Sequence, residues 1–129
     1  MSTIFAQRGL ISIIIFLATM STIFAQQKSK DNFQVFWKTW EIALRKDDKA
    51  TLASLTQFPF YYINEDINTE KELLKRYNDF FDKETKKSLL TQKPIKSNKD
   101  YIIESGYIIY TFSKTDDGWK FISIYEWDD

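Results

Sequence analysis

The sequence predicts an α+β domain in which helices come first and an antiparallel sheet comes last. Apolar residues recur at helical spacing between residues 33 and 90, whereas residues 101–127 are rich in β-branched and aromatic strand formers. No Pro-, Gly- or Ser-rich linker divides residues 26–129, so these residues are expected to form a single domain.

The first predicted helix starts at Asp31, which can cap it with Gln34 as the reciprocal partner. Its apolar residues follow the i, i+3, i+4, i+7 pattern, which places them in one stripe on the helix. The stripe consists of Phe33, Phe36, Trp37, Trp40, Ala43 and Leu44. Asp47-Asp48 is expected to end this helix and to cap a shorter one that carries Leu52 and Leu55.

A strand over residues 58–63 and a turn over residues 64–66 are expected next. Thr69 and Glu72 form a capping box that opens a third helix, in which Glu72 and Arg76 are spaced for an ion pair. The apolar stripe of this helix is Leu73, Leu74, Tyr77, Phe80 and Phe81. Asp82 can cap a further helical turn that continues through Leu90 and stops before Pro94.

Three strands are predicted after Pro94, over residues 101–103, 107–112 and 119–127. Residues 115–118 supply a hairpin turn, in which Gly118 is free to adopt positive φ. Strict alternation along the last strand would place Trp119, Phe121, Ser123, Tyr125 and Trp127 on one face. The other face of the strand would then carry Lys120, Ile122, Ile124 and Glu126.

Residues 1–25 have the composition of a cleavable signal peptide. Arg8 is their only charged residue, the apolar run 10–17 follows it, and Ala25 is the expected last residue removed. The protein is therefore expected to be secreted or periplasmic. The alternative is a retained membrane anchor, although the apolar run is shorter than the ~20 residues that a spanning helix needs.

The heptapeptide at residues 1–7, Met-Ser-Thr-Ile-Phe-Ala-Gln, recurs unchanged at residues 20–26. Two such short copies do not form a structural repeat. We interpret them as a local duplication or an extension of the targeting segment. Translation starting at Met20 would instead omit the apolar run and leave the protein in the cytoplasm. Terminal sequencing of the mature protein distinguishes a start near Gln26 from a start at Met20.

The composition excludes several chemistries. The 129 residues contain no Cys and no His, so thiol or imidazole catalysis, Cys/His zinc sites and disulfides are absent. The 18 basic and 18 acidic side chains balance, which argues against nucleic acid as a partner. Neither a metal nor another cofactor is expected.

Four segments resemble the NTF2-like (SnoaL-like, cystatin-like α+β) superfamily. They are Phe33-x-x-Phe36-Trp37-x-x-Trp40, residues 46–53, Phe58-Pro59-Phe60 with the helix after it, and Asp117-Gly118-Trp119-Lys120-Phe121. The segment Phe58-Pro59-Phe60 with the helix after it is similar to that of small secreted bacterial members of unknown function. The resemblance implies helices packed over a curved antiparallel sheet, forming a cone. It also implies a pocket used for small-molecule binding, for isomerase- or hydratase-type catalysis or for protein contacts.

Six residues are candidates for a ligand site. A phenol and a carboxylate for proton transfer can come from Tyr77, Tyr62 (or Tyr61) and Asp66. Core packing of the tyrosine rings and a turn at Asp66 are the favoured interpretation. Glu126 is a candidate pocket carboxylate, although a solvated strand end is the simpler interpretation. An aromatic box for a sugar or an apolar ligand can be formed by Trp37, Trp40, Trp119 and Trp127, yet the helical stripe of the first two favours the core. Trp127, near the end of the chain, is the best candidate for an exposed interaction surface.

These observations favour an exported, non-catalytic domain that binds a small apolar or aromatic ligand or a protein partner. The absence of His restricts catalysis to Tyr and carboxylates, so the alternative is a cofactor-free lyase or isomerase. A third prediction is a homodimer that forms through an open face of the sheet.

Overall fold

A computed structural model describes residues 32–127 of the chain. The predicted signal peptide at residues 1–25, the duplicated heptapeptide and the predicted cap Asp31 lie outside the described residues.

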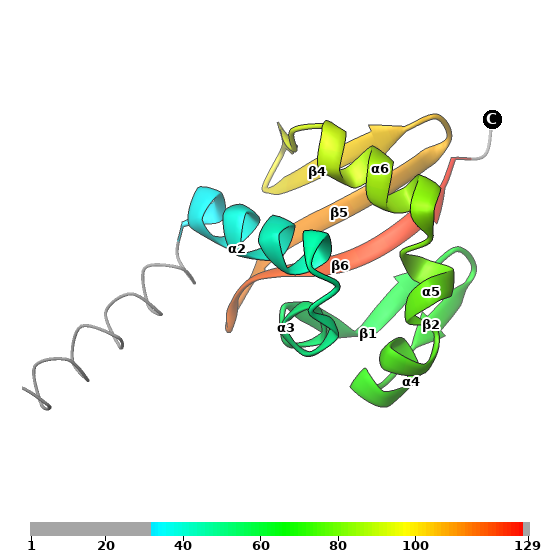
Figure 1. The fold of residues 1–129 in the computed structure, drawn as a ribbon. Helices are drawn as coiled ribbons and strands as arrows, with labels where there is room; N and C mark the ends of the chain where they lie inside the picture. Colours follow the sequence, from blue (N-terminus) through cyan, green and yellow to red (C-terminus); the bar gives the residue numbers. More distant parts are fainter. Residues whose placement is uncertain (1–31, 128–129) are drawn as a thin grey trace, which may run out of the picture.

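The described chain is an α+β domain in which five helices lie on one face of a six-stranded sheet (Figure 1). The strand order is β2-β1-β6-β5-β4-β3, and the sheet is open rather than closed. The prediction of a purely antiparallel sheet was wrong, because β1 pairs in parallel with β6 while all other neighbours are antiparallel. The helices are α2 (Phe33–Arg45), α3 (Lys49–Ser54), α4 (Glu70–Lys75), α5 (Tyr77–Phe80) and α6 (Lys83–Thr91). The strands are β1 (Thr56–Tyr62), β2 (Glu65–Ile67), β3 (Ile95–Ser97), β4 (Asp100–Ser105), β5 (Ile108–Thr115) and β6 (Gly118–Glu126).

Helix α2 buries the predicted apolar stripe in full. Its N-cap is Asn32 and not Asp31: the Asn32 side-chain oxygen accepts from the backbone N–H groups of Gln34 and Val35, at 2.9 and 3.3 Å. Asn and Asp are equally good caps, so sequence preference alone cannot choose between neighbouring residues of these types. Asp48 caps α3 as predicted, by accepting from the Thr51 N–H.

The chain reverses at Ile63-Asn64, one residue earlier than the predicted turn. Tyr62 pairs with Glu65, so Ile63 and Asn64 form a two-residue hairpin loop in which both have positive φ, 40° and 83°. Asp66, predicted to lie in the turn, therefore belongs to β2 and pairs with Tyr61.

The predicted third helix is divided at Arg76 into α4 and α5. Leu74 consequently leaves the apolar stripe and is 37% exposed, while Leu73, Tyr77 and Phe80 stay buried. The Thr69 cap is confirmed, since its hydroxyl accepts from the Glu72 N–H at 3.2 Å. Among residues 32–127, Glu72 and Arg76 do not form the predicted ion pair. Arg76 instead forms ion pairs with Glu65 and Asp79.

The region after Pro94 contains four strands rather than three, because the short β3 adds an outer strand beside β4. The predicted division of the last strand into two alternating faces was also wrong. Thr111 pairs with Ser123 and Phe112 with Phe121, so Ile122 is an extra, bulged residue in β6. Phe121 and Ile124, three residues apart, consequently both face the core, whereas Ser123 and Tyr125 face away from the helices.

The core between the helices and the sheet is filled by aromatic rings. Trp40 and Phe112 are completely buried, with ring centroids 5.2 Å apart in an edge-to-face arrangement. Phe33 stacks on Tyr101 at 3.7 Å, and Phe121 packs against Phe112 at 5.0 Å. Such pairs add about 0.5–1.5 kcal/mol each beyond the burial of their surface, which helps a domain without disulfides to remain folded.

Candidate functional site

The six predicted site residues do not meet at one place. Trp37 and Trp40 lie in the aromatic core, where the Trp37 ring also packs edge-to-face against Phe112 at 5.5 Å. The remaining four, on four different elements, are distributed over the surface and its hollows: Tyr62 on β1, Asp66 on β2, Tyr77 on α5 and Glu126 on β6. Asp66 and Glu126 are exposed, whereas Tyr77 is buried and Tyr62 half-buried.

Tyr77 lines a cleft of about 660 Å³ between the end of α2, α5 and the start of α6. The other residues that line it include three lysines and two aspartates. They are Asp47, Lys49, Asn78, Phe81, Asp82, Lys83 and Lys86. Charged residues thus make up most of the lining, and oppositely charged side chains lie next to one another in it.

Asp47 is the centre of the hydrogen bonds in this cleft. Its Oδ1 atom accepts from the Tyr77 hydroxyl at 2.7 Å and from the Lys86 ammonium at 2.8 Å. The Lys49 ammonium lies 5.0 Å from the centroid of the Tyr77 ring. These contacts connect α6 and α5 to the loop after α2, so they hold the helical layer together.

The pKa values in the cleft are shifted away from neutrality. Hydrogen bonds from Lys86 and then Tyr77 lower the pKa of the Asp47 carboxyl, because both donors favour its charged form. Burial, followed by the hydrogen bond to Asp47, raises the pKa of the Tyr77 phenol. A general acid or base at neutral pH needs the opposite shifts, towards pH 7.

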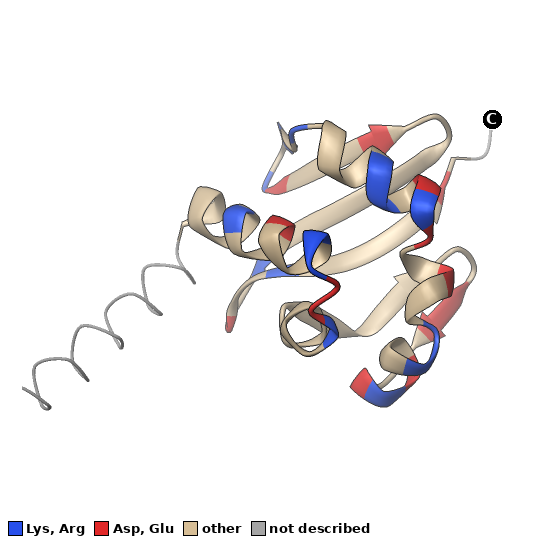
Figure 2. Cartoon of the chain, viewed as in Figure 1, with Lys and Arg blue, Asp and Glu red and all other residues tan. Residues whose placement is uncertain are grey.

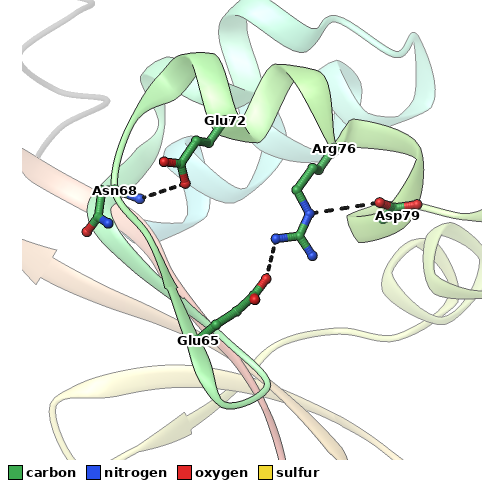
Figure 3. Close-up of polar contacts among 5 residues, drawn as sticks. All are labelled: Glu65, Asn68, Glu72, Arg76 and Asp79. Carbon is green, nitrogen blue, oxygen red and sulfur yellow. Dashed lines mark hydrogen bonds and ion pairs between the residues drawn. The ribbon is translucent and has the colours of Figure 1, made fainter.

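Arg76 organises a second hollow beside Tyr62, which Ile63, Asn64 and Glu65 also line. Figure 3 shows its guanidinium between Glu65 of β2 and Asp79 of α5, whose nearest oxygen is 3.9 Å from Nε. The guanidinium also lies over the rings of Tyr62 and Phe80, at 5.6 and 5.1 Å from their centroids. Arg76 therefore joins the β1–β2 hairpin to the break between α4 and α5.

A groove of about 410 Å³ crosses the face of the sheet opposite to the helices. In Figure 1 the helices of the described chain lie on the near side of the sheet, so none of these covers the groove. We call this side the outer face. Its floor is formed by side chains from β4, β5 and β6, namely Ile102, Ile109, Thr111 and Ser123.

The strand register aligns one row of side chains across the whole outer face. Ile95 of β3 pairs with Ile102, which pairs with Thr111 of β5. Thr111 pairs with Ser123 of β6, and Ser123 pairs with Tyr61 of β1. Paired residues share a face, so the row is continuous from one side of the sheet towards the other.

Aromatic side chains form one end of the groove. Trp127 is 56% exposed and Tyr125 is 38% exposed, while Ile109 beside them is buried although it lies outside the aromatic core. The Trp127 N–H donates to the Tyr107 carbonyl at 2.7 Å, which continues the β5–β6 pairing and fixes the backbone of Trp127. The structure thus exposes two aromatic side chains to solvent at this end of the groove.

The charges that line the groove are negative. Asp100 and Glu104 lie on β4, and Asp100 accepts from the Ser113 hydroxyl at 2.6 Å. Among the residues that the structure describes, the groove lining contains neither Lys nor Arg. Lys and Arg side chains are instead concentrated on the helices, where they outnumber the acids (Figure 2).

Sequence reasoning missed the Asp47 cluster and, apart from the exposed Trp127, the groove. Asp47 was interpreted as a helix end, and its partners Tyr77 and Lys86 lie 30 and 39 residues further along the chain. The β6 bulge moves Tyr125 and Trp127 to the face opposite to Trp119 and Phe121. No local signal at Ile122 marks this change.

No protein-family model, curated protein or solved structure matches this chain. Among residues 32–127, none of the helices has the length and apolar character required to cross a membrane. Within that same range, no three His, Cys, Asp or Glu side chains are grouped so that they could hold a metal ion.

Proposed function

We propose that this chain is an exported, non-catalytic binding protein of NTF2-like architecture, and that it contacts a protein partner through the outer face of its sheet. The observation that carries the proposal is the groove on that face, with Trp127 and Tyr125 exposed at one end. Exposed aromatic residues beside a concave surface are typical of interaction sites, in which Trp and Tyr contribute much of the binding energy.

The packing on the other side of the sheet supports a surface site. An NTF2-like pocket would lie between the helices and the sheet, where Trp40, Phe112 and Phe121 are completely or almost completely buried. Opening a space there would remove aromatic contacts that stabilise the domain. A partner that binds the outer face leaves this core unchanged.

The alternative of a lyase or isomerase has weaker support. Its best proton-transfer pair is Tyr77 with Asp47, which line the cleft beside α5. Hydrogen bonds from Lys86 and then Tyr77 lower the pKa of Asp47 and make it a weaker base. Burial and then the hydrogen bond to Asp47 raise the pKa of Tyr77 and make it a weaker acid. The same contacts are well suited to holding α5 and α6 in place.

Site-specific photo-crosslinking tests the proposed surface. A photoreactive phenylalanine analogue would replace Tyr125 in the groove and, as the matched control, Leu74 on α4. The two side chains have similar exposure, 38% and 37%. Tyr125 lines the groove, whereas Leu74 belongs to α4 in the helical layer. We expect covalent adducts of defined mass from position 125 in producing cells, and none from position 74.

The mass of the adduct identifies the partner. An adduct of twice the mass of the chain would show that the partner is a second copy, whereas another mass would show a different protein. Equal labelling from both positions, or none from position 125, would contradict the proposed surface.

A further inference from the structure

We infer that the groove on the outer face binds a basic, extended peptide segment of another protein, with a Lys or Arg side chain placed against Trp127. This inference rests on the proposed function and specifies the chemistry of the partner. It combines the charge of the groove, its aromatic end and its width.

Charge is the first argument. Asp100 and Glu104 lie within the groove, and no basic residue that lines it, among those the structure describes, compensates them. A cationic partner would supply the missing counter-charges, whereas an acidic partner would be repelled.

The aromatic end is the second argument. An ammonium or guanidinium group is attracted to the face of a Trp or Tyr ring, and Trp is the most favourable of the aromatic residues. This chain already uses such contacts internally, since Arg76 lies over Tyr62 and Lys49 over Tyr77. In contrast, none of the cation–aromatic contacts within residues 32–127 involves the exposed ring of Trp127.

The width of the groove favours a peptide over a small free amine. Its lining extends from Ser97 on β3 to Trp127 after β6, across four adjacent strands. Strand spacings of about 4.8 Å make this distance roughly 14 Å, which corresponds to about four residues of extended chain. A single amine would occupy only the part of the groove beside one carboxylate or one ring.

A second copy of this chain fits the groove less well. In a symmetric dimer the same patch is used by both protomers, so Asp100 and Glu104 of one protomer would approach the same acids of the other. Like charges brought together at an interface oppose association. Within residues 32–127, the helices carry more basic than acidic side chains, and they lie on the opposite side of the sheet from the groove.

The fluorescence of Trp127 provides a direct assay of peptide binding. The other three tryptophans are buried or half-buried, so quenching by an added solute reports mainly on Trp127. The purified protein would be titrated with a short lysine-rich peptide that lacks aromatic residues. Matched peptides with Gln or Glu at the Lys positions, spermidine and a neutral oligosaccharide would serve as the comparison ligands.

We expect that, of these ligands, only the lysine-rich peptide binds to saturation and protects Trp127 from quenching. Binding should weaken when salt is raised from 0.1 to 1 M, because the screening length falls from about 10 to about 3 Å. Glu104→Gln should weaken binding about two- to fivefold, as expected for one exposed charge pair. Trp127→Ala should weaken it by a similar factor, measured by calorimetry. Glu70→Gln, on α4 and exposed, is the matched control and should have no effect.

Several results would overturn the inference. Equal binding of the Gln peptide or of the oligosaccharide would show that charge does not select the ligand. Binding of spermidine as tight as that of the peptide would show a site for a free amine. An effect of Glu104→Gln no larger than that of Glu70→Gln would remove the groove acids from the site. Failure of every cationic probe, with crosslinking at position 125 intact, would reject the basic peptide and leave the proposed surface standing.

Discussion

The hydrogen bond from Tyr77 to Asp47 joins α5 to the loop after α2, and Tyr77→Phe removes it while keeping the ring. The ring contact with Phe81, at 5.2 Å between centroids, should therefore persist. A hydrogen bond to a charged group contributes about 1.5–3 kcal/mol to stability. The Asp47 side chain is 48% exposed, so solvent competes for it and we expect a loss of about 1 kcal/mol. For a domain of this size, the melting temperature would fall by about 4–8 °C.

A double-mutant cycle with Asp47→Ala tests whether the hydrogen bond is responsible. Urea unfolding of the four proteins should give a coupling energy of about 1 kcal/mol between the two positions, because the residues are in direct contact. Tyr61→Phe is the matched control, since Tyr61 is exposed on the outer face and should change stability by less than about 0.5 kcal/mol. The reasoning is refuted if Tyr77→Phe has the same effect with and without Asp47.

Two further perturbations test the cleft and the core. The pKa of folded Tyr77 is raised, so its contribution to stability is complete below the unfolded value of about 10 and is lost as the pH rises further. Thermal unfolding followed between neutral pH and pH 11 should show a smaller alkaline loss for Tyr77→Phe than for the wild type, and parallel curves would contradict this. Phe112→Ala should destabilise the domain by about 3–5 kcal/mol in urea, because Phe112 is completely buried. Tyr107→Ala, at an exposed position, should change stability by less than about 0.5 kcal/mol, and similar losses for both variants would argue against the described core.

The helices were the most predictable part of the fold, because their signals are local. The stripe from Phe33 to Leu44 follows the helical period, and every member of it is buried. The caps Asp48, Thr69 and Asp82 all accept from the N–H three residues later, as their spacing predicts. These interactions join residues within one helical turn, so the local sequence is sufficient to predict them.

The hairpin turn and the parallel pairing were less predictable, because tertiary contacts determine them. Ile63 is a β-branched residue at positive φ, which its local preference opposes. Its N–H donates to the Ile124 carbonyl at 2.9 Å, and its side chain packs against the core. This contact belongs to the parallel arrangement of β1 and β6, strands that are far apart in sequence. A turn position chosen from local residue types cannot include such a constraint.

The candidate site was the least predictable part, and a single extra residue in β6 explains much of the difference. Without the bulge at Ile122, Trp127 would share a face with Trp119 and Phe121, and Glu126 would face away from the helices. With it, Phe121 and Ile124 both contribute to the aromatic core, while Tyr125 and Trp127 emerge beside Ile109 on the outer face. The same backbone irregularity therefore completes the packed side of the sheet and supplies the aromatic end of the groove. Bulges are common where a side chain must be redirected next to a functional site, and the position of this one therefore agrees with the binding surface that we propose.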